Sequence, residues 1–124
     1  MICHIVLFNP KKDLDDTARR SFALDIQGAL RSIPGIIRAV VGRSIDVNPG
    51  YRRSLGDKTY EFAAVLEFKD RAGLVGYLNH PLHKELGALF WRHCESTVIL
   101  EIEATDAKSD DAVELLMSAR PPAR

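Results

Sequence analysis

The amino-terminal segment alternates between two faces that are both largely apolar. One face of residues 2–9 carries a histidine among apolar side chains, namely Ile2, His4, Val6 and Phe8. The other face carries Cys3, Ile5 and Leu7. Successive side chains of a strand point to opposite sides, so this pattern predicts a strand that must be covered on both faces.

A helix is expected next, over residues 13–32. Asp13 can serve as its amino-terminal cap, and Pro34-Gly35 ends it. Apolar residues at helical spacing predict a core-facing stripe of Phe22, Ile26, Ala29, Leu30 and Ile33.

Two strands should follow the helix. Residues 36–47 are rich in β-branched side chains, and Gly42 suggests a bulge or bend within them. Residues 48–57 contain proline, glycine and charged side chains typical of an exposed loop. Residues 60–68 alternate cleanly, with Tyr60, Phe62, Ala64, Leu66 and Phe68 on one face.

The remaining pattern predicts two helical segments and a last strand. Asp70 can cap a short helix, which His80-Pro81 interrupts because a residue before proline avoids helical backbone angles. Helix then resumes over residues 82–94, and a strand covers residues 97–104. The order is βαββαβ, so we expect an α+β, ferredoxin-like fold with a four-stranded antiparallel sheet.

Both helices of such a fold cover the same face of the sheet. The other face would stay bare, although its strands carry apolar residues, and a large bare apolar patch indicates an interface or a cavity. Two sheets that meet face to face would cover it, so we expect a homodimeric α/β barrel. We expect this domain to span residues 1–105.

The last residues, 106–124, form a separate helical tail in this interpretation. Asp110-Asp111 can start its helix, and Val113, Leu116 and Met117 line one face. A packing arm on the barrel or on a partner subunit is the favoured role, with peptide recognition as the alternative.

Composition narrows the function classes. The 17 Lys and Arg residues balance 17 Asp and Glu residues, and no long basic run suggests nucleic-acid binding. No apolar run approaches the roughly 20 residues of a membrane span, and the amino terminus lacks the features of a signal peptide. Two cysteines, Cys3 and Cys94, make no disulfide framework. A cytoplasmic protein without nucleic-acid or membrane partners is therefore expected.

Several short motifs together resemble the stress-responsive A/B barrel (Dabb) family of dimeric α/β barrels. They are His4 to Phe8, Ile33-Pro34-Gly35-Ile36, Val41-Gly42-Arg43 and, above all, Tyr77-Leu78-Asn79-His80-Pro81-Leu82-His83. The resemblance covers residues 2 to about 104 and implies a homodimer with a small-molecule cavity between sheet and helices. It implies no metal or other cofactor.

The resemblance also implies site residues. Olivetolic acid cyclase, a plant enzyme of this family that closes a linear polyketide by aldol condensation, has a catalytic tyrosine and histidine that match Tyr77 and His83. Its early-strand histidine matches His4. At the position of a further pocket histidine of that enzyme, this chain has Phe62. In this respect the chain departs from the catalytic residues of the enzyme. His4, Phe62 and His80 are the expected ligand contacts, although for His80 the favoured role is to fix the turn before Pro81 by hydrogen bonding.

Imidazole suits a general base at neutral pH, and a phenol can donate to a carbonyl oxygen that gains charge. Tyr77 and His83 are therefore the catalytic candidates, unless Tyr77 packs in the core and His83 orients its helix.

Metal binding by His4, His80 and His83 is disfavoured because no further ligand completes an obvious set nearby. Arg43 could meet an anionic ligand or pair with Glu61 or Glu67. Phe90 and Trp91 shape a cavity wall or belong to the core.

Three functions remain open from the sequence. The first is a cofactor-free cyclase or lyase that acts on a polyketide-like or other carbonyl substrate. The second is a non-catalytic dimer that binds a small apolar or aromatic metabolite in a stress response. The third is a cofactor-independent monooxygenase.

Overall fold

The computed structural model describes residues 1–47 and 59–118 of the chain. Its four strands are β1 (Ile2–Pro10), β2 (Arg38–Arg43), β3 (Phe62–Phe68) and β4 (Cys94–Glu103). Its helices are α1 (Asp16–Ser32), α3 (Arg71–Leu78), α4 (Pro81–His93) and α5 (Asp110–Met117). The predicted loop over residues 48–57 lies outside the described residues.

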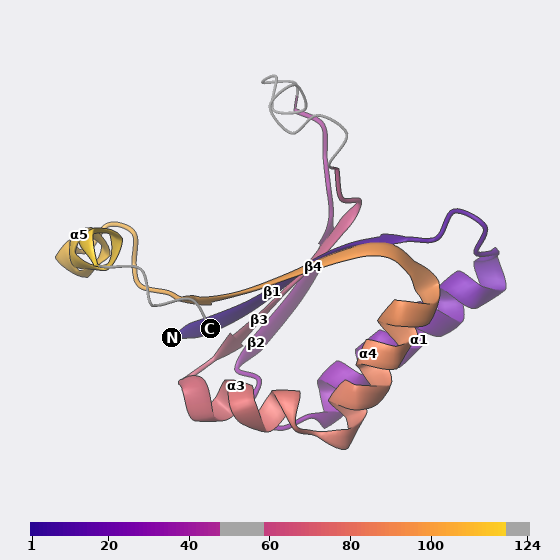
Figure 1. Cartoon of the computed structure of the whole chain (residues 1–124), viewed down its shortest axis with the longest axis horizontal. Coiled ribbons are helices and arrows are strands. Elements are labelled where there is room, and N and C mark those ends of the chain that lie inside the picture. Colours follow the sequence, from indigo (N-terminus) through magenta and orange to yellow (C-terminus); the bar gives the residue numbers. More distant parts are fainter. Residues whose placement is uncertain (48–58, 119–124) are drawn as a thin grey trace.

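The strands form one antiparallel sheet in the order β2-β3-β1-β4. Figure 1 shows α1, α3 and α4 together on one side of this sheet. This arrangement is the ferredoxin-like α+β fold, so the predicted order of elements and the predicted antiparallel sheet are confirmed. Within the described ranges, no helix is long and apolar enough to cross a membrane.

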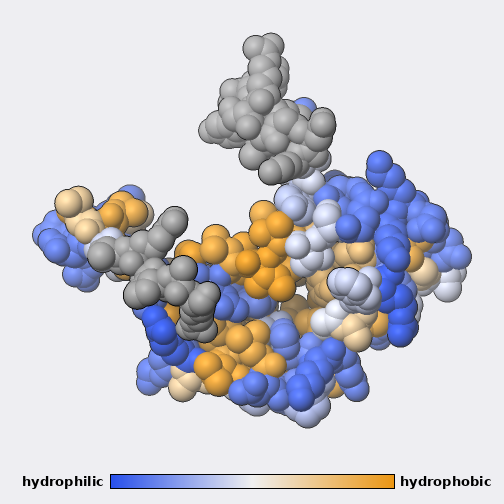
Figure 2. All heavy atoms as spheres, viewed as in Figure 1, coloured by the Kyte–Doolittle hydropathy of each residue, from blue (hydrophilic) through white to orange (hydrophobic). Residues whose placement is uncertain are grey.

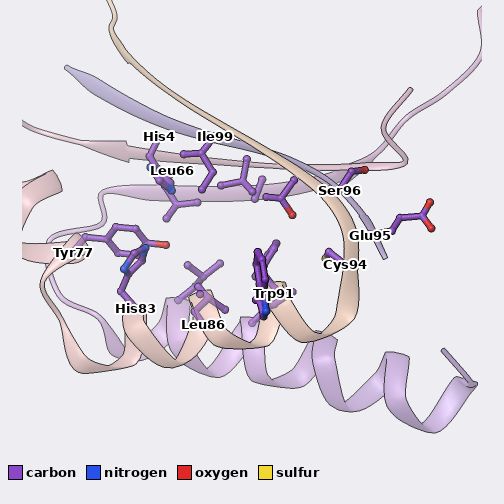
Figure 3. A pocket seen from close by; sticks show the side chains of 17 residues that line it. His4, Leu66, Tyr77, His83, Leu86, Trp91, Cys94, Glu95, Ser96 and Ile99 are labelled. Carbon is purple, nitrogen blue, oxygen red and sulfur yellow. The ribbon is translucent and has the colours of Figure 1, made fainter. Parts of the chain in front are cut away.

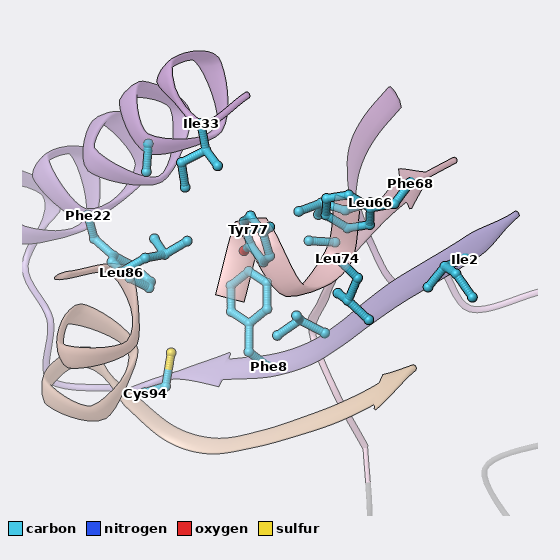
Figure 4. Packing of buried hydrophobic residues seen from close by; sticks show 13 residues of the cluster. Ile2, Phe8, Phe22, Ile33, Leu66, Phe68, Leu74, Tyr77, Leu86 and Cys94 are labelled. Atoms are coloured by element: carbon cyan, nitrogen blue, oxygen red, sulfur yellow. The ribbon is translucent and has the colours of Figure 1, made fainter. Parts of the chain in front are cut away.

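Register decides which side chains meet the helices. Across the sheet, His4 pairs with Leu66 of β3 and with Glu101 of β4. Paired residues share a face, so the helix-facing side of β1 is the one that carries His4, Val6 and Phe8. Figure 4 shows the core that results, in which Phe8 of β1 and Leu66 of β3 lie among side chains of α1, α3 and α4.

The helix boundaries follow their capping residues. The Asp15 carboxylate accepts a hydrogen bond from the Ala18 N–H at 2.8 Å, so the expectation that Asp13 caps α1 is wrong by two residues. The Asp70 carboxylate accepts from the Gly73 N–H at 2.9 Å, as predicted. The predicted break at His80-Pro81 is also confirmed, because His80 precedes α4 and Pro81 is its first residue.

Three strand predictions need correction. The second strand is shorter than expected, and it pairs with β3 in unbroken register through Gly42, so no bulge forms there. The register shifts instead at Asn9 and Pro10, between β1 and β4. The last strand begins at Cys94, directly after α4, and ends at Glu103, whereas residues 97–104 were expected.

One face of the sheet carries no helix within the described residues. Four of its apolar side chains are exposed, namely Val40, Val98, Leu100 and Ile102. Figure 2 shows apolar side chains along the strands, whereas the outer surfaces of the helices are polar. We call the helix-free face of the sheet the open face. Helix α5 lies beyond the end of the sheet, away from α1 and α4, with Leu116 and Met117 exposed (Figure 1).

Candidate functional site

A cavity of about 360 Å³ lies between the helix-facing side of the sheet and the helices. Most of its wall is apolar, and Val6, Leu66, Leu86 and Ile99 contribute to it. Three polar side chains, His4, Tyr77 and His83, lie together at one end (Figure 3). We call this space the histidine cavity. An apolar cavity with a few convergent polar groups is the usual form of a small-molecule site.

The break between α3 and α4 brings Tyr77 and His83 together. Tyr77 lies in the last turn of α3, and His83 lies in the first turn of α4. Their ring centroids are 4.7 Å apart, with the planes at 62°. Figure 3 shows both side chains pointing into the histidine cavity. A continuous helix would not direct residues six positions apart to one point, so the interruption at Pro81 creates the pair.

The polar atoms of this pair are free to meet a ligand. Among the described residues, neither the Tyr77 hydroxyl nor the His83 imidazole has a hydrogen-bond partner. Tyr77 is only 3% exposed, and burial raises its pKa to about 12. The phenol therefore keeps its proton at neutral pH and acts as a hydrogen-bond donor.

His4 is held in place by a carboxylate from the neighbouring strand. Its Nδ1 lies 3.2 Å from Oε1 of Glu101, and its ring is 5.3 Å from that of Tyr77, edge to face. A carboxylate can only accept, so Nδ1 carries the proton and Nε2 is left as an acceptor when the ring is neutral. Burial lowers the pKa of His4, and the hydrogen bond to Glu101 opposes this shift.

Sequence reasoning missed Glu101. The clue was the alternation of β4, which places two glutamates, Glu101 and Glu103, on the face that also carries Thr97 and Ile99. An acidic residue on the face that packs against helices calls for a partner. Only the register between β1 and β4 identifies that partner as His4.

The other two predicted ligand contacts lie elsewhere. The His80 imidazole accepts a hydrogen bond from the Leu82 N–H at 3.1 Å and so caps α4. This agrees with the interpretation that His80 fixes the turn before Pro81. His80 is not among the residues that line the histidine cavity. Phe62 stacks on Phe8 with centroids 5.6 Å apart and lines a second, adjacent cavity.

Both aromatic residues near the end of α4 line the histidine cavity. Phe90 packs against Phe8 and Phe22 and so belongs to the core as well. Trp91 is 88% exposed, so it lies where the cavity opens to solvent. Cys94 also lines this space, and burial raises the pKa of its thiol.

The described side chains offer no obvious metal centre. Residues 1–47 and 59–118 contain no group of three or more His, Cys, Asp or Glu residues arranged around a common point. Arg43 shares the helix-facing side with Phe62, whereas the alternation of β3 turns Glu61 and Glu67 to the other side. Pairing of Arg43 with either glutamate is therefore wrong.

The fold and this cavity define a class of small α/β barrel domain. The chain belongs to the stress responsive A/B barrel domain family, Dabb, whose family model matches residues 2–104. The family predicted from the sequence motifs is thereby confirmed. A comparison with curated protein sequences finds no significant match.

Solved structures with the same fold include three informative relatives. A Dabb family protein from Mesorhizobium loti is 23% identical, with a TM-score of 0.67 over 85% of this chain and 97% of that one. The hydroxynitrile lyase from Passiflora edulis is 22% identical, with a TM-score of 0.67 over 85% and 95%. A dimeric ferredoxin-like protein from Thermobifida fusca is 19% identical, with a TM-score of 0.65 over 83% and 90%.

Proposed function

We propose that this protein is a cofactor-free lyase or cyclase that acts on a small, mostly apolar carbonyl compound bound in the histidine cavity. The observation that carries the proposal is the pair of Tyr77 and His83. Both side chains point into one apolar space, and neither is hydrogen bonded to another described residue. Polar groups that only stabilised the fold would be paired with each other or with the backbone.

The two side chains suit complementary roles. The Tyr77 hydroxyl, with a pKa raised to about 12, donates a hydrogen bond to a carbonyl oxygen that gains negative charge. In condensation, the His83 imidazole takes a proton from the carbon next to that carbonyl, which gives the enolate. In cleavage of a β-hydroxyketone it takes the hydroxyl proton, the carbon–carbon bond breaks and its electron pair moves to the carbonyl as an enolate; from a hydroxynitrile it takes the hydroxyl proton and cyanide leaves. The apolar wall, including Leu66, Leu86 and Ile99, holds the apolar part of the substrate.

The fold neighbours support this chemistry in general terms. The protein from Passiflora edulis is a hydroxynitrile lyase, so this fold carries lyase activity in another protein. A binding-only protein would use Tyr77 and His83 as hydrogen-bonding groups alone, whereas their placement side by side also suits proton transfer. We therefore favour the enzyme over the binding-only and monooxygenase alternatives.

The test compares the turnover of hydroxynitriles and β-hydroxyketones by the wild type, Tyr77→Phe and His83→Gln. Loss of a general base typically costs about a hundredfold or more in rate. Loss of one donor to the developing oxyanion costs on the order of a hundredfold. We expect decreases of this size, with thermal unfolding showing that both variants remain folded.

His93→Gln is the matched control, because His93 lies on the same helix but packs against Phe22 at 5.3 Å. It should keep full turnover. Wild-type turnover that His83→Gln leaves unchanged would refute the catalytic assignment. Ligand binding without turnover of either substrate class would favour the metabolite-binding alternative.

We also propose that the chain forms a homodimer through the open face. Several fold neighbours, including the protein from Thermobifida fusca, are described as dimeric. The exposed side chains of Val40, Val98, Leu100 and Ile102 form an apolar surface of the kind that monomers rarely present.

A further inference from the structure

A second cavity of about 510 Å³ adjoins the histidine cavity. The two share Ile26, Ala64 and Phe90 in their walls. Along β3, Ala64 lies between Leu66, which lines the first cavity, and Phe62, which lines the second. Ile26, Ala64 and Phe90 are common to both walls, so the two cavities lie side by side along the helix-facing side of the sheet.

The second cavity combines an aromatic floor with two cationic side chains. Phe8, Phe22 and Phe62 line its apolar part. Arg19 of α1 and Arg43 of β2 line the same space. We call it the arginine cavity.

The two guanidinium groups have no acidic partner among the described residues. No ion pair or side-chain hydrogen bond forms at Arg19 or Arg43 within residues 1–47 and 59–118. The nearby carboxylate of Asp15 is engaged by the Ala18 N–H. Two arginines beside aromatic rings form a site for an anion attached to an apolar body, since guanidinium binds carboxylate in a two-point geometry.

We propose that the ligand is an elongated, mostly apolar carboxylate whose carboxylate group lies between Arg19 and Arg43. Its reacting carbonyl group lies at the other end, beside Tyr77 and His83. This inference rests on the proposed function for the role of that second end, but the carboxylate preference itself does not depend on catalysis.

The length of the site sets the size of the ligand. His4 lines the histidine cavity and Phe8 lines the arginine cavity, and four residues of strand rise by roughly 13 Å. A medium-chain acyl group or a short run of linked rings spans this distance. A compact molecule would reach one set of polar groups only.

Octanoate and octanamide provide the test, because they share the apolar chain and differ in charge. The chain has a single tryptophan, and Trp91 lines the histidine cavity, so its fluorescence reports on ligand entry. We expect octanoate to bind about tenfold more tightly than octanamide. Arg19→Gln and Arg43→Gln should each reduce this preference, and the double variant should abolish it while octanamide affinity stays the same.

Two arginines on the same elements serve as controls. Arg20→Gln changes the next residue of α1, and Arg38→Gln changes the first residue of β2, which pairs with Glu67 of β3. Neither arginine lines the arginine cavity, so both variants should keep the carboxylate preference. Absence of octanoate binding, equal binding of octanoate and octanamide, or an equal loss in the control variants would overturn the proposal.

His83→Gln separates this proposal from the proposed function. The variant should bind octanoate with the wild-type preference although it lacks the base. A carboxylate preference without any turnover would refute catalysis alone. Turnover of carbonyl substrates without a carboxylate preference would refute the arginine site alone.

Discussion

At the scale of single residues, the His4 imidazole lies between the proposed catalytic pair and a carboxylate. It is only 2% exposed, whereas the Glu101 side chain is 41% exposed. Burial disfavours the charged imidazole, and the carboxylate favours it, with burial the larger effect on the pKa. His4 is therefore neutral at neutral pH, with its proton on Nδ1, and it offers the acceptor Nε2 to its surroundings.

Replacing Glu101 with glutamine should lower the pKa of His4 further. The variant removes the negative charge that raises this pKa and leaves the effect of burial, so protonation needs a more acidic solution. NMR titration of the histidine ring protons measures the change, with the His4 signal assigned through His4→Asn.

Glu103→Gln is the matched control. Glu103 shares the face of β4 with Glu101 but pairs with Arg71 at 2.8 Å, so its removal should leave the pKa of His4 unchanged. An unchanged His4 pKa in Glu101→Gln would mean that the carboxylate does not interact with the ring in solution.

Sequence analysis identified some of these residues and missed others for a physical reason. Tyr77 and His83 lie on either side of a proline break that can be read locally, and His4 lies on a strand with clear alternation. Glu101 is contributed by a strand about a hundred positions away, and its partner depends on the register between β1 and β4. The size of the cavity depends on how Leu86, Trp91 and Cys94 pack, which no local pattern gives.

At the scale of elements, the segment between β1 and α1 shows why the sequence pattern misplaced the start of a helix. Asp13, Asp15 and Asp16 all have the chemistry of a helix cap, and the sequence pattern does not rank them. The structure selects Asp15, whose extended backbone directs its carboxylate at the Ala18 N–H. The lengths of β2 and β4 were misjudged similarly, because strands end where their partner ends and not where β-branched residues end.

Replacing Asp15 with alanine should lower the free energy of unfolding by about 1 kcal/mol, the usual cost of losing a helix cap. The loss arises because the Ala18 N–H is left without its acceptor in the first turn of α1. Urea denaturation followed by circular dichroism measures it. Asp13→Ala removes the same side chain two positions earlier and should cost much less; equal losses in the two variants would contradict the capping assignment.

At the scale of the whole molecule, the sheet separates two kinds of surface. Its helix-facing side holds both cavities, and its open face holds exposed apolar side chains. The antiparallel order was predictable from the βαββαβ sequence of elements, and so was a surplus of apolar surface. The register of β1 with β4 was needed to identify which side chains of each strand lie on the open face.

If the open face is the dimer interface, a charge at its centre should prevent association. Leu100 of β4 is 56% exposed and pairs with Ile5 of the central strand β1, so Leu100→Lys would place an unpaired ammonium group between two apolar sheets. Sedimentation equilibrium should show a dimer for the wild type and a monomer for Leu100→Lys. Val75→Lys is the control, because Val75 is 51% exposed but lies on α3, away from the open face, and should leave the dimer intact. A monomeric wild type, or a dimer that survives Leu100→Lys, would contradict an interface at the open face.

Since both cavities lie on the opposite side of the sheet, a folded Leu100→Lys monomer that still binds octanoate would further show that each subunit carries a complete ligand site.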